Sequence, residues 1–273
     1  MQPVVSVIVT CDYDSGTPAS WNAVRAALQG LAGQDFQETA EFIFVESADV
    51  APKMPADLKR ILPSLRVIEA PAASAAALKS AGVRAASAEL VALIDGDCVA
   101  DPGWLSRFVG LMRERPDIAV VSGRTHYGTH RFLDRVMALV SRSYLDQGRT
   151  APTRHIAINN AGFRRAALLA HPCSVEAGPH MSMLQADAMA RAGHRFLFDP
   201  RLAVRHDYEG WMTEREIRLS LGYGVIKARL QDRRLPYALL ARLGYFSIPL
   251  FTFLRILHTC WNCARRRRFY GVA

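Results

Sequence analysis

The chain has 273 residues, 50% hydrophobic and 22% charged, a composition that suits a globular protein with a large core and excludes a disordered one. Its net charge of +9 is uneven, because the last 41 residues contain eight arginines and no Lys, Asp or Glu, so that the preceding 232 residues carry only +1. No basic face exists in that larger part, which argues against a nucleic-acid partner.

The first part of the chain alternates between strand and helix signals. Residues 4–9 form a continuous β-branched run, as expected for a strand buried on both faces of a sheet, and 21–34 carry apolar residues at helical spacing. We predict further strands at 41–47, 66–71 and 89–95, and further helices at 57–65 and 74–88. This alternation indicates crossover units and a mostly parallel, doubly wound α/β sheet, which binds ligands at the carboxyl ends of its strands.

The second part is less regular. An amphipathic helix is predicted at 101–117, a strand at 118–126 and another helix at 130–146. Residues 157–171 read as a strand end, a loop and a helix. Residues 181–200 read as a helix that ends at Gly193, followed by a strand.

Asp95-Gly96-Asp97 comes directly at the end of the predicted strand 89–95. Two carboxylates separated by one residue can share a divalent cation, because Mg²⁺ takes one or two carboxylates together with phosphate oxygens and water. Gly96 would let a phosphate approach the backbone closely. The same residues also suit a β-turn, since Asp-Gly is a common turn dipeptide. Their place at the end of a central strand favours the metal site, because two unpaired carboxylates there would repel each other.

A series of motifs follows the chain from Val5 to His206. They read VSVIVTCDY (5–13), ALQGLAGQ (27–34), EFIFVES (41–47), LKSAGVRAASAELVALIDGD (78–97), PGWL (102–105), NNAGFRRAAL (159–168) and GHRFLFDPRLAVRH (193–206). In their order and spacing they resemble the family 2 glycosyltransferases, inverting enzymes of the GT-A fold with a D-x-D motif. The resemblance covers 4–207 and implies a GT-A, Rossmann-like α/β domain that uses a nucleotide-sugar donor.

The resemblance also implies roles for single residues. Asp95 and Asp97 would be the D-x-D pair and would hold Mn²⁺ or Mg²⁺ on the donor diphosphate, where the metal offsets the charge of the leaving group. His206 matches a late histidine of the family that can complete the metal or diphosphate site; the alternative is a surface histidine. The nucleotide-diphosphate sugar, with a UDP-sugar as first choice, would be bound by Thr10, Asp12, Glu46, Lys79, Asp95, Gly96 and Asp97.

Two departures from the family pattern concern the nucleotide pocket. Thr10 stands where the family usually has a proline, and Glu46-Ser47 replaces a pair of aspartates. Because of these two changes, the resemblance does not indicate which nucleotide base the donor carries. For Glu46 the alternative is a carboxylate at a strand end that faces water.

A third departure concerns the catalytic base. The family carries Glu-Asp twelve and eleven residues before the glycine matched by Gly193, and an ungapped count reaches Met181 and Ser182, which cannot take the acceptor proton. A two-residue shift offers His180 instead. The nearest carboxylates are Glu176 and Asp187, the latter within a predicted helix where it also suits a solvated face. These three residues are the candidate bases.

The C-terminal extension, 233–273, is apolar and cationic together. Its longest uncharged run, 243–254, has twelve residues, fewer than the about 20 that a membrane-spanning helix needs. We therefore predict an amphipathic helical segment in the membrane interface, with apolar side chains in lipid and arginines on anionic headgroups. The alternatives are a helix packed on the domain and a solvated arginine tail.

The N-terminus and the cysteines indicate the compartment. The chain enters its first apolar run without a basic leader or a small-residue cleavage site, so we expect no secretory signal. The five cysteines are scattered, and no second ligand pair completes a zinc site at Cys260 and Cys263. We expect a cytoplasmic protein that lies peripherally at the inner face of the cytoplasmic membrane.

Taken together, the sequence predicts a GT-A catalytic domain at 1–232 with the extension at 233–273, acting on a lipid-linked or envelope glycan acceptor. A nucleotidyltransferase is one alternative, although the loop at 11–20 has no lysine or arginine for a phosphate. A non-catalytic, donor-binding scaffold of the same fold is the other, because the Glu-Asp pair is missing.

Overall fold

A computed structural model describes residues 2–11, 20–71, 74–128, 131–173, 181–206 and 210–272. In these residues nine strands form one sheet, in the order β3-β2-β1-β4-β8-β6-β9-β5, with β7 paired to β9. The strands are β1 (Val5–Thr10), β2 (Ala40–Ser47), β3 (Leu65–Ala70), β4 (Leu90–Asp95), β5 (Cys98–Ala100), β6 (Ile118–Tyr127), β7 (Ala151–Thr153), β8 (Asn160–Arg164) and β9 (Arg195–His206).

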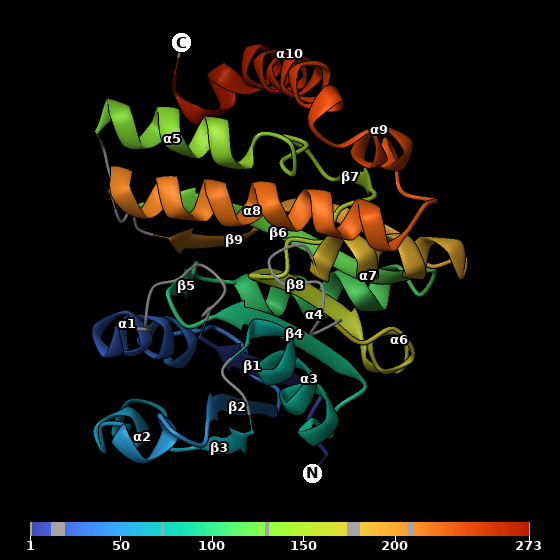
Figure 1. Ribbon diagram of the computed structural model, residues 1–273. Coiled ribbons are helices and arrows are strands. Elements are labelled where there is room, and N and C mark those ends of the chain that lie inside the picture. The colour runs from blue at the N-terminus through green and yellow to red at the C-terminus, as the bar shows by residue number, and fades with distance from the viewer. Residues whose placement is uncertain are drawn as a thin grey trace.

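Helices cover both faces of the sheet and extend beyond it at the C-terminal end (Figure 1). They are α1 (Trp21–Ala32), α2 (Leu58–Ile61), α3 (Ala75–Ala85), α4 (Trp104–Glu114), α5 (Phe132–Arg142), α6 (Arg165–Ala170), α7 (Met181–Arg191), α8 (Trp211–Gln231), α9 (Ala238–Arg242) and α10 (Ile248–Arg266). The described residues also include the short 3-10 helices η1 (Ala51–Lys53), η3 (Gly244–Ser247) and η4 (Arg267–Tyr270).

The strands β3-β2-β1-β4 are parallel, as the alternation of signals predicts. Central strand β1 is buried along its whole length. Its Val7 and Val9 belong to one core with side chains of α1, α2 and α4, whereas Ile8 belongs to a second core with side chains of α3, α6 and α7. Successive residues of a strand point to opposite faces, so the unbroken apolar run at 4–9 reflects a sheet covered on both sides.

The rest of the sheet mixes strand directions. β8 is antiparallel to β4 and β6, while β9 is parallel to β6 and antiparallel to β5 and β7. The loop that the sequence predicts within 157–171 is instead strand β8. A Cβ at Gly162 would lie 1.9 Å from the ring of Phe108 in α4, so β8 can pack there only because this residue has no side chain.

A bulge in the pairing of β6 and β9 aligns the ends of these two strands. The register shifts between Gly123 and Arg124, where a Cβ on Gly123 would lie 1.9 Å from the carbonyl oxygen of Leu202. At this bulge the side-chain amide of Asn160 donates hydrogen bonds to the carbonyl oxygens of Arg124 and Leu202 at 2.8 and 2.9 Å. The shift determines which residues of β6 and β9 meet at the edge of the sheet.

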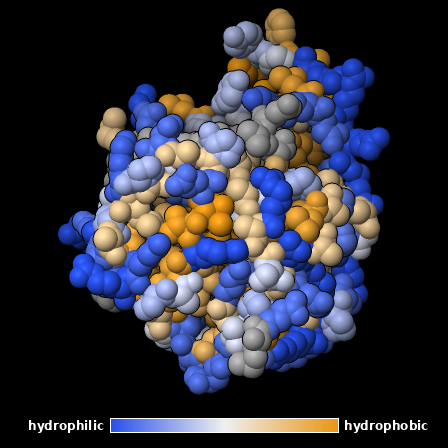
Figure 2. All heavy atoms as spheres, turned by 90° about the horizontal axis from the view of Figure 1, so that it is seen from below, coloured by the Kyte–Doolittle hydropathy of each residue, from blue (hydrophilic) through white to orange (hydrophobic). Residues whose placement is uncertain are grey.

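The C-terminal helices α8, α9 and α10 lie at the end of the molecule far from the N-terminus (Figure 1). One side of α10 packs on α5, where Sγ of Cys263 lies 4.0 Å from the carbonyl oxygen of Leu139, but no residue of α10 is buried. Within the described residues, no helix is long and apolar enough to cross a membrane. Seen from below, from the end of the molecule away from α10, a hydrophobic area lies among hydrophilic residues (Figure 2).

Candidate functional site

Three neighbouring parallel strands end at one edge of the sheet. Thr10 at the end of β1 lies opposite Val45 of β2 and opposite Asp95 at the end of β4, and Glu46 follows Val45. Thr10, Glu46 and Asp95 are all buried. The fold thus brings these predicted site residues together at the edge where doubly wound sheets bind ligands.

Lys79 reaches the same edge from α3. Its side chain is 1% exposed, with Nζ 2.6 Å from Oδ1 of Asp95 and 3.0 Å from Oγ1 of Thr10, to which it donates. A buried ammonium needs a carboxylate beside it, because an unpaired charge is strongly disfavoured away from water. Asp95 therefore neutralises Lys79 within the protein.

Asp97, two residues after Asp95 in the sequence, has a different environment. Its Oδ2 lies 3.2 Å from Nε2 of His206, and the two side chains are 34% and 16% exposed. Burial raises the pKa of Asp97, but the hydrogen bond and the positive charge of His206 outweigh burial, so that the pKa lies below its ordinary value. Asp97 is thus an ionised carboxylate that solvent and ligands can reach.

His206, at the end of β9, lies between the neighbouring strands β5 and β6. Cys98 of β5 lies opposite His206 in antiparallel register, and Tyr127 of β6 lies opposite it in parallel register. The rings of Tyr127 and His206 are 5.7 Å apart, and the hydroxyl of Tyr127 donates to Glu214 of α8 at 3.0 Å. Tyr127 was not among the residues predicted from the sequence, because only the pairing beyond the bulge places it here.

Asn159 supports the turn that carries Asp97. Its carbonyl oxygen accepts the backbone N–H of Asp95 at 3.3 Å, and its side-chain amide donates to Oγ1 of Thr125 at 3.0 Å and to Sγ of Cys98 at 3.6 Å. It therefore links β4, β5 and β6 around the turn. The sequence marks Asn159 only as part of the motif at 159–168 and does not signal this role.

Glu46 does not face water. It is fully buried, and its Oε1 accepts the backbone N–H of Ser47 at 2.6 Å, while Oε2 and the hydroxyl of Ser47 have no hydrogen-bond partner in the described part of the chain. Burial, followed by the charge of Glu46, raises the pKa of the nearby thiol of Cys11. A buried carboxylate oxygen without a protein partner is suited to accept an N–H group of a ligand.

The donor set fits a divalent cation that is shared with a ligand. No group of three or more His, Cys, Asp or Glu side chains converges on one point within the described ranges. A cation here would take one oxygen of Asp97 and Nε2 of His206, and fill its other positions with phosphate oxygens and water. Mn²⁺ and Mg²⁺ accept such mixed ligand sets.

The candidate bases remain predictions. His180 and Glu176 lie outside the described residues, as does Asp12 of the expected nucleotide pocket. Asp187 forms an ion pair with Arg191, one turn along α7, and its side chain is 29% exposed. That environment is typical of a solvated helix face.

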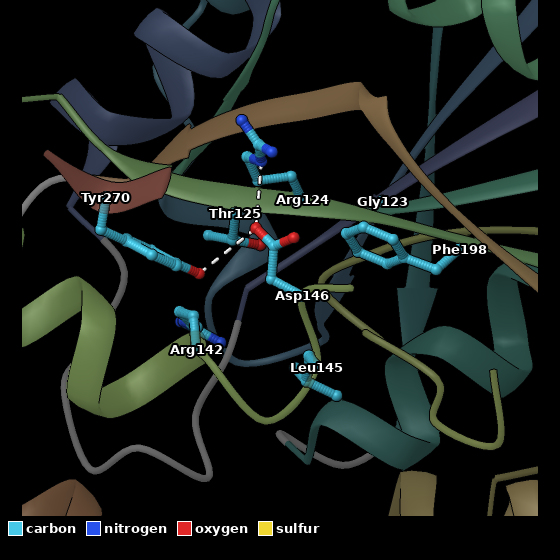
Figure 3. Close-up of a pocket in the computed structure, with 8 residues that line it drawn as sticks. All are labelled: Gly123, Arg124, Thr125, Arg142, Leu145, Asp146, Phe198 and Tyr270. Carbon is cyan, nitrogen blue, oxygen red and sulfur yellow. Dashed lines mark hydrogen bonds and ion pairs between the residues drawn. The ribbon is translucent and has the colours of Figure 1, made fainter. Parts of the chain in front are cut away.

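The end of the chain contributes to a cavity of about 10 Å³ beside β6 (Figure 3). Asp146, on its wall, accepts hydrogen bonds from Nε of Arg124 at 3.0 Å and from the hydroxyl of Tyr270 at 3.3 Å. Nε of Arg266 donates to the carbonyl oxygen of Asp146 at 2.5 Å. Part of the arginine run at 265–268 is thus bound to the domain instead of forming a solvated tail.

Comparison with known proteins supports the fold assignment. Residues 6–170, more than half of the chain, match the family model described as Glycosyl transferase family 2. The mannosyltransferase PcManGT from Pyrobaculum calidifontis, in complex with GDP-Man and Mn²⁺, is 19% identical with a TM-score of 0.63, and the match covers 98% of this chain and 76% of that one. S. aureus TarS 1–349, in complex with UDP, is 15% identical with a TM-score of 0.52, covering 80% and 65%.

A search of the curated proteins found no match. The structural likenesses confirm the predicted fold class, a GT-A-type α/β domain with a C-terminal helical extension.

Proposed function

The chain belongs to glycosyl transferase family 2, and we propose that it is an inverting, metal-dependent enzyme that moves a sugar from a nucleotide-diphosphate sugar to an acceptor hydroxyl. The observation that carries this proposal is the pair of Asp97 and His206, which lies partly exposed at the end of β9, beside the converging ends of the parallel strands. An ionised carboxylate next to an imidazole suits a cation that bridges protein and diphosphate.

Each residue of the pair would have a defined task in donor binding. Asp97 and His206 would hold Mn²⁺ or Mg²⁺, which as a Lewis acid offsets the charge of the departing nucleoside diphosphate. Gly96 lies between the two aspartates, where it is buried and its N–H donates to the carbonyl oxygen of Thr10 at 2.8 Å, so that it ties the turn to the end of β1. Asp95 would act through its ion pair with Lys79, which keeps the end of β4 in place.

Glu46 would recognise the nucleotide base. Its buried Oε2 would accept an N–H group, which both uracil and guanine offer, so UDP- and GDP-sugars are the donors to test. The PcManGT structure contains GDP-Man, and the TarS structure contains UDP. The corresponding experiment is a thermal-shift screen of nucleoside diphosphates and their sugars with and without Mn²⁺. A metal-dependent rise in Tm with one nucleotide supports the proposal, and no rise with any of them contradicts it.

Acceptor activation would fall to His180 or Glu176. An inverting transfer needs a group that takes the acceptor proton while the hydroxyl attacks the anomeric carbon. The position expected for the family base holds Met181, which is buried at the start of α7 and cannot act as a base. This observation also favours a second candidate function, a donor-binding scaffold of the same fold that does not transfer sugar.

The acceptor would be presented at a membrane surface, as part of a lipid-linked or envelope glycan. Support comes from α10, which exposes Phe253, Ile256 and Trp261 at 55% or more and has two arginines in its last turn. Apolar and cationic side chains on one helix suit the interface of an anionic bilayer. The segment 233–273 would then lie on the membrane while its Arg266 and Tyr270 stay bound to the domain.

A further inference from the structure

Exposed large hydrophobic side chains are confined to one part of the molecule. In the described residues, none of them lies before Phe132, although 2–128 supply most of the sheet. Apart from Leu169 in α6, they belong to α5 and the residues just after it, and to the segment from α8 to the end of the chain. Large apolar surfaces of this kind mark interaction sites in soluble proteins.

Two pairs of these side chains lie outside the extension predicted from the sequence. Phe132 and Leu133, in the first turn of α5, are 62% and 59% exposed. Trp211 and Met212, in the first turn of α8, are 68% and 65% exposed. Side chains of this size forgo favourable apolar burial when they face only water.

Both first turns follow directly from the strands of the site. Tyr127, at the end of β6, lies five residues before Phe132, and His206, at the end of β9, lies five residues before Trp211. Tyr127 and His206 are paired in register, and a hydrogen bond from Arg218 to Ser141 joins α8 to α5. The two helices therefore start from the same edge of the sheet, the edge that carries His206, and both run in the same direction in Figure 1.

The positive charge of this part of the chain favours an anionic partner. Residues 210–273 contain twelve Lys and Arg but only three Asp and Glu, whereas 1–209 contain 22 of each sign. The whole net charge of +9 thus lies in the segment that exposes apolar side chains. Arg131, just before α5, and Arg135, in its first turn, lie on either side of the exposed pair in the sequence, and Asp134 is buried. Aromatic and aliphatic side chains among cations match an anionic lipid interface.

We propose that the first turns of α5 and α8 insert into an anionic bilayer together with the C-terminal helices, so that the catalytic edge of the sheet faces the lipid. This inference rests on the membrane contact of the proposed function and adds a second insertion point next to His206. An amphiphilic acceptor could then reach the site from the bilayer surface without leaving the lipid.

The test compares vesicle binding of variants of the full chain. One variant combines Phe132→Ser with Leu133→Ser, a second combines Trp211→Ser with Met212→Ser, and the control is Leu169→Ser, an exposed leucine of α6. Co-sedimentation uses vesicles of phosphatidylcholine with and without phosphatidylglycerol. Each double variant should bind the anionic vesicles at least about tenfold more weakly, since two partly inserted large side chains account for about 1.4 kcal/mol. The control should bind like the wild type.

Three outcomes overturn the inference or separate it from the proposed function. Wild-type vesicle binding by both double variants, with loss only in Phe253→Ser and Trp261→Ser of α10, would overturn the second insertion point and leave the C-terminal contact intact. Self-association without lipid that the double variants abolish, with no vesicle binding by the wild type, would assign the surface to a second copy. Failure of the wild type to bind any nucleotide would refute the transferase while the vesicle result stands.

Discussion

Lys79 and Asp95 form a buried ion pair, with Nζ 2.6 Å from Oδ1 and both side chains largely removed from solvent. Asp97, two residues along the chain, is one-third exposed and meets His206 instead. The two carboxylates of one short motif therefore have separate roles. Asp95 is paired with Lys79 inside the protein, whereas Asp97 is accessible to a ligand.

This difference predicts unequal costs for two equivalent substitutions. Asp95→Asn removes the carboxylate that lies 2.6 Å from the buried ammonium of Lys79, so the free energy of unfolding should fall by about 3–5 kcal/mol. Asp97→Asn is the matched control and should cost less than about 1 kcal/mol, because its carboxylate is partly solvated. Urea denaturation of both variants at neutral pH measures the two values. Equal losses would contradict the separate roles.

Gly162 allows β8 to lie against α4. Gly162→Ala would place a Cβ 1.9 Å from the ring of Phe108, so we expect a loss of about 1–3 kcal/mol from overpacking. Gly110→Ala is the control, because no atom lies within 4 Å of a Cβ there and helix α4 should gain about 0.5–1 kcal/mol. Thermal denaturation of the pair should give shifts of opposite sign. A stabilised Gly162→Ala variant would show that the contact is not as close as described.

Asp199 makes stability depend on acid pH. Burial raises the pKa of its carboxyl, but hydrogen bonds from Arg107 and from the backbone of Arg201 outweigh burial and hold the pKa below its ordinary value. In the unfolded chain the carboxyl titrates near its ordinary pKa of about 3.9. Its contribution is thus present above that pH and is lost as the pH falls through the lower folded pKa.

Asp199→Asn should therefore lower stability at neutral pH by about 2 kcal/mol, the contribution of a charged hydrogen bond. The difference from the wild type should shrink as the pH falls below about 4. Denaturant titrations across that range provide the check. A difference that stays constant with pH would rule out the depressed pKa.

Sugar-transfer kinetics of two variants distinguish the candidate catalytic bases His180 and Glu176. If His180 takes the acceptor proton, His180→Ala should lose sugar transfer by at least about a hundredfold but keep its donor affinity, since a base acts on the acceptor. Glu176→Gln tests the second candidate in the same assay. Unchanged turnover in one variant removes that residue, and unchanged turnover in both leaves the scaffold as the better description.

The strand and helix pattern of the first part could be predicted because each element is a long periodic segment with a clear signal. Asp95, Asp97 and His206 could be proposed as site residues because they lie in motifs of the family, and their roles stay predictions. Strand β8 was wrongly predicted as a loop, since Asn and Gly usually mark turns and the need for Gly162 lies in Phe108, which is far away in sequence. The same holds for Tyr127 and Asn159, whose places depend on strand pairing across a bulge.

Helix α8 and the exposed first turns could not be predicted individually for a related reason. The sequence shows that the C-terminal segment is basic and apolar, but only the packed structure shows which side chains remain uncovered. The split between Asp95 and Asp97 also needed the structure, because Lys79 reaches Asp95 from α3, a separate element of the fold.

Calorimetric titration of the protein with GDP and UDP, each with and without Mn²⁺, tests the central claim most directly. One nucleotide should bind with Mn²⁺, and chelation of the metal should weaken that binding at least about tenfold. Asp97→Asn with Mn²⁺ should bind as weakly as the chelated wild type. Undiminished, metal-dependent binding by Asp97→Asn would contradict the assignment of Asp97 and His206 to the donor site.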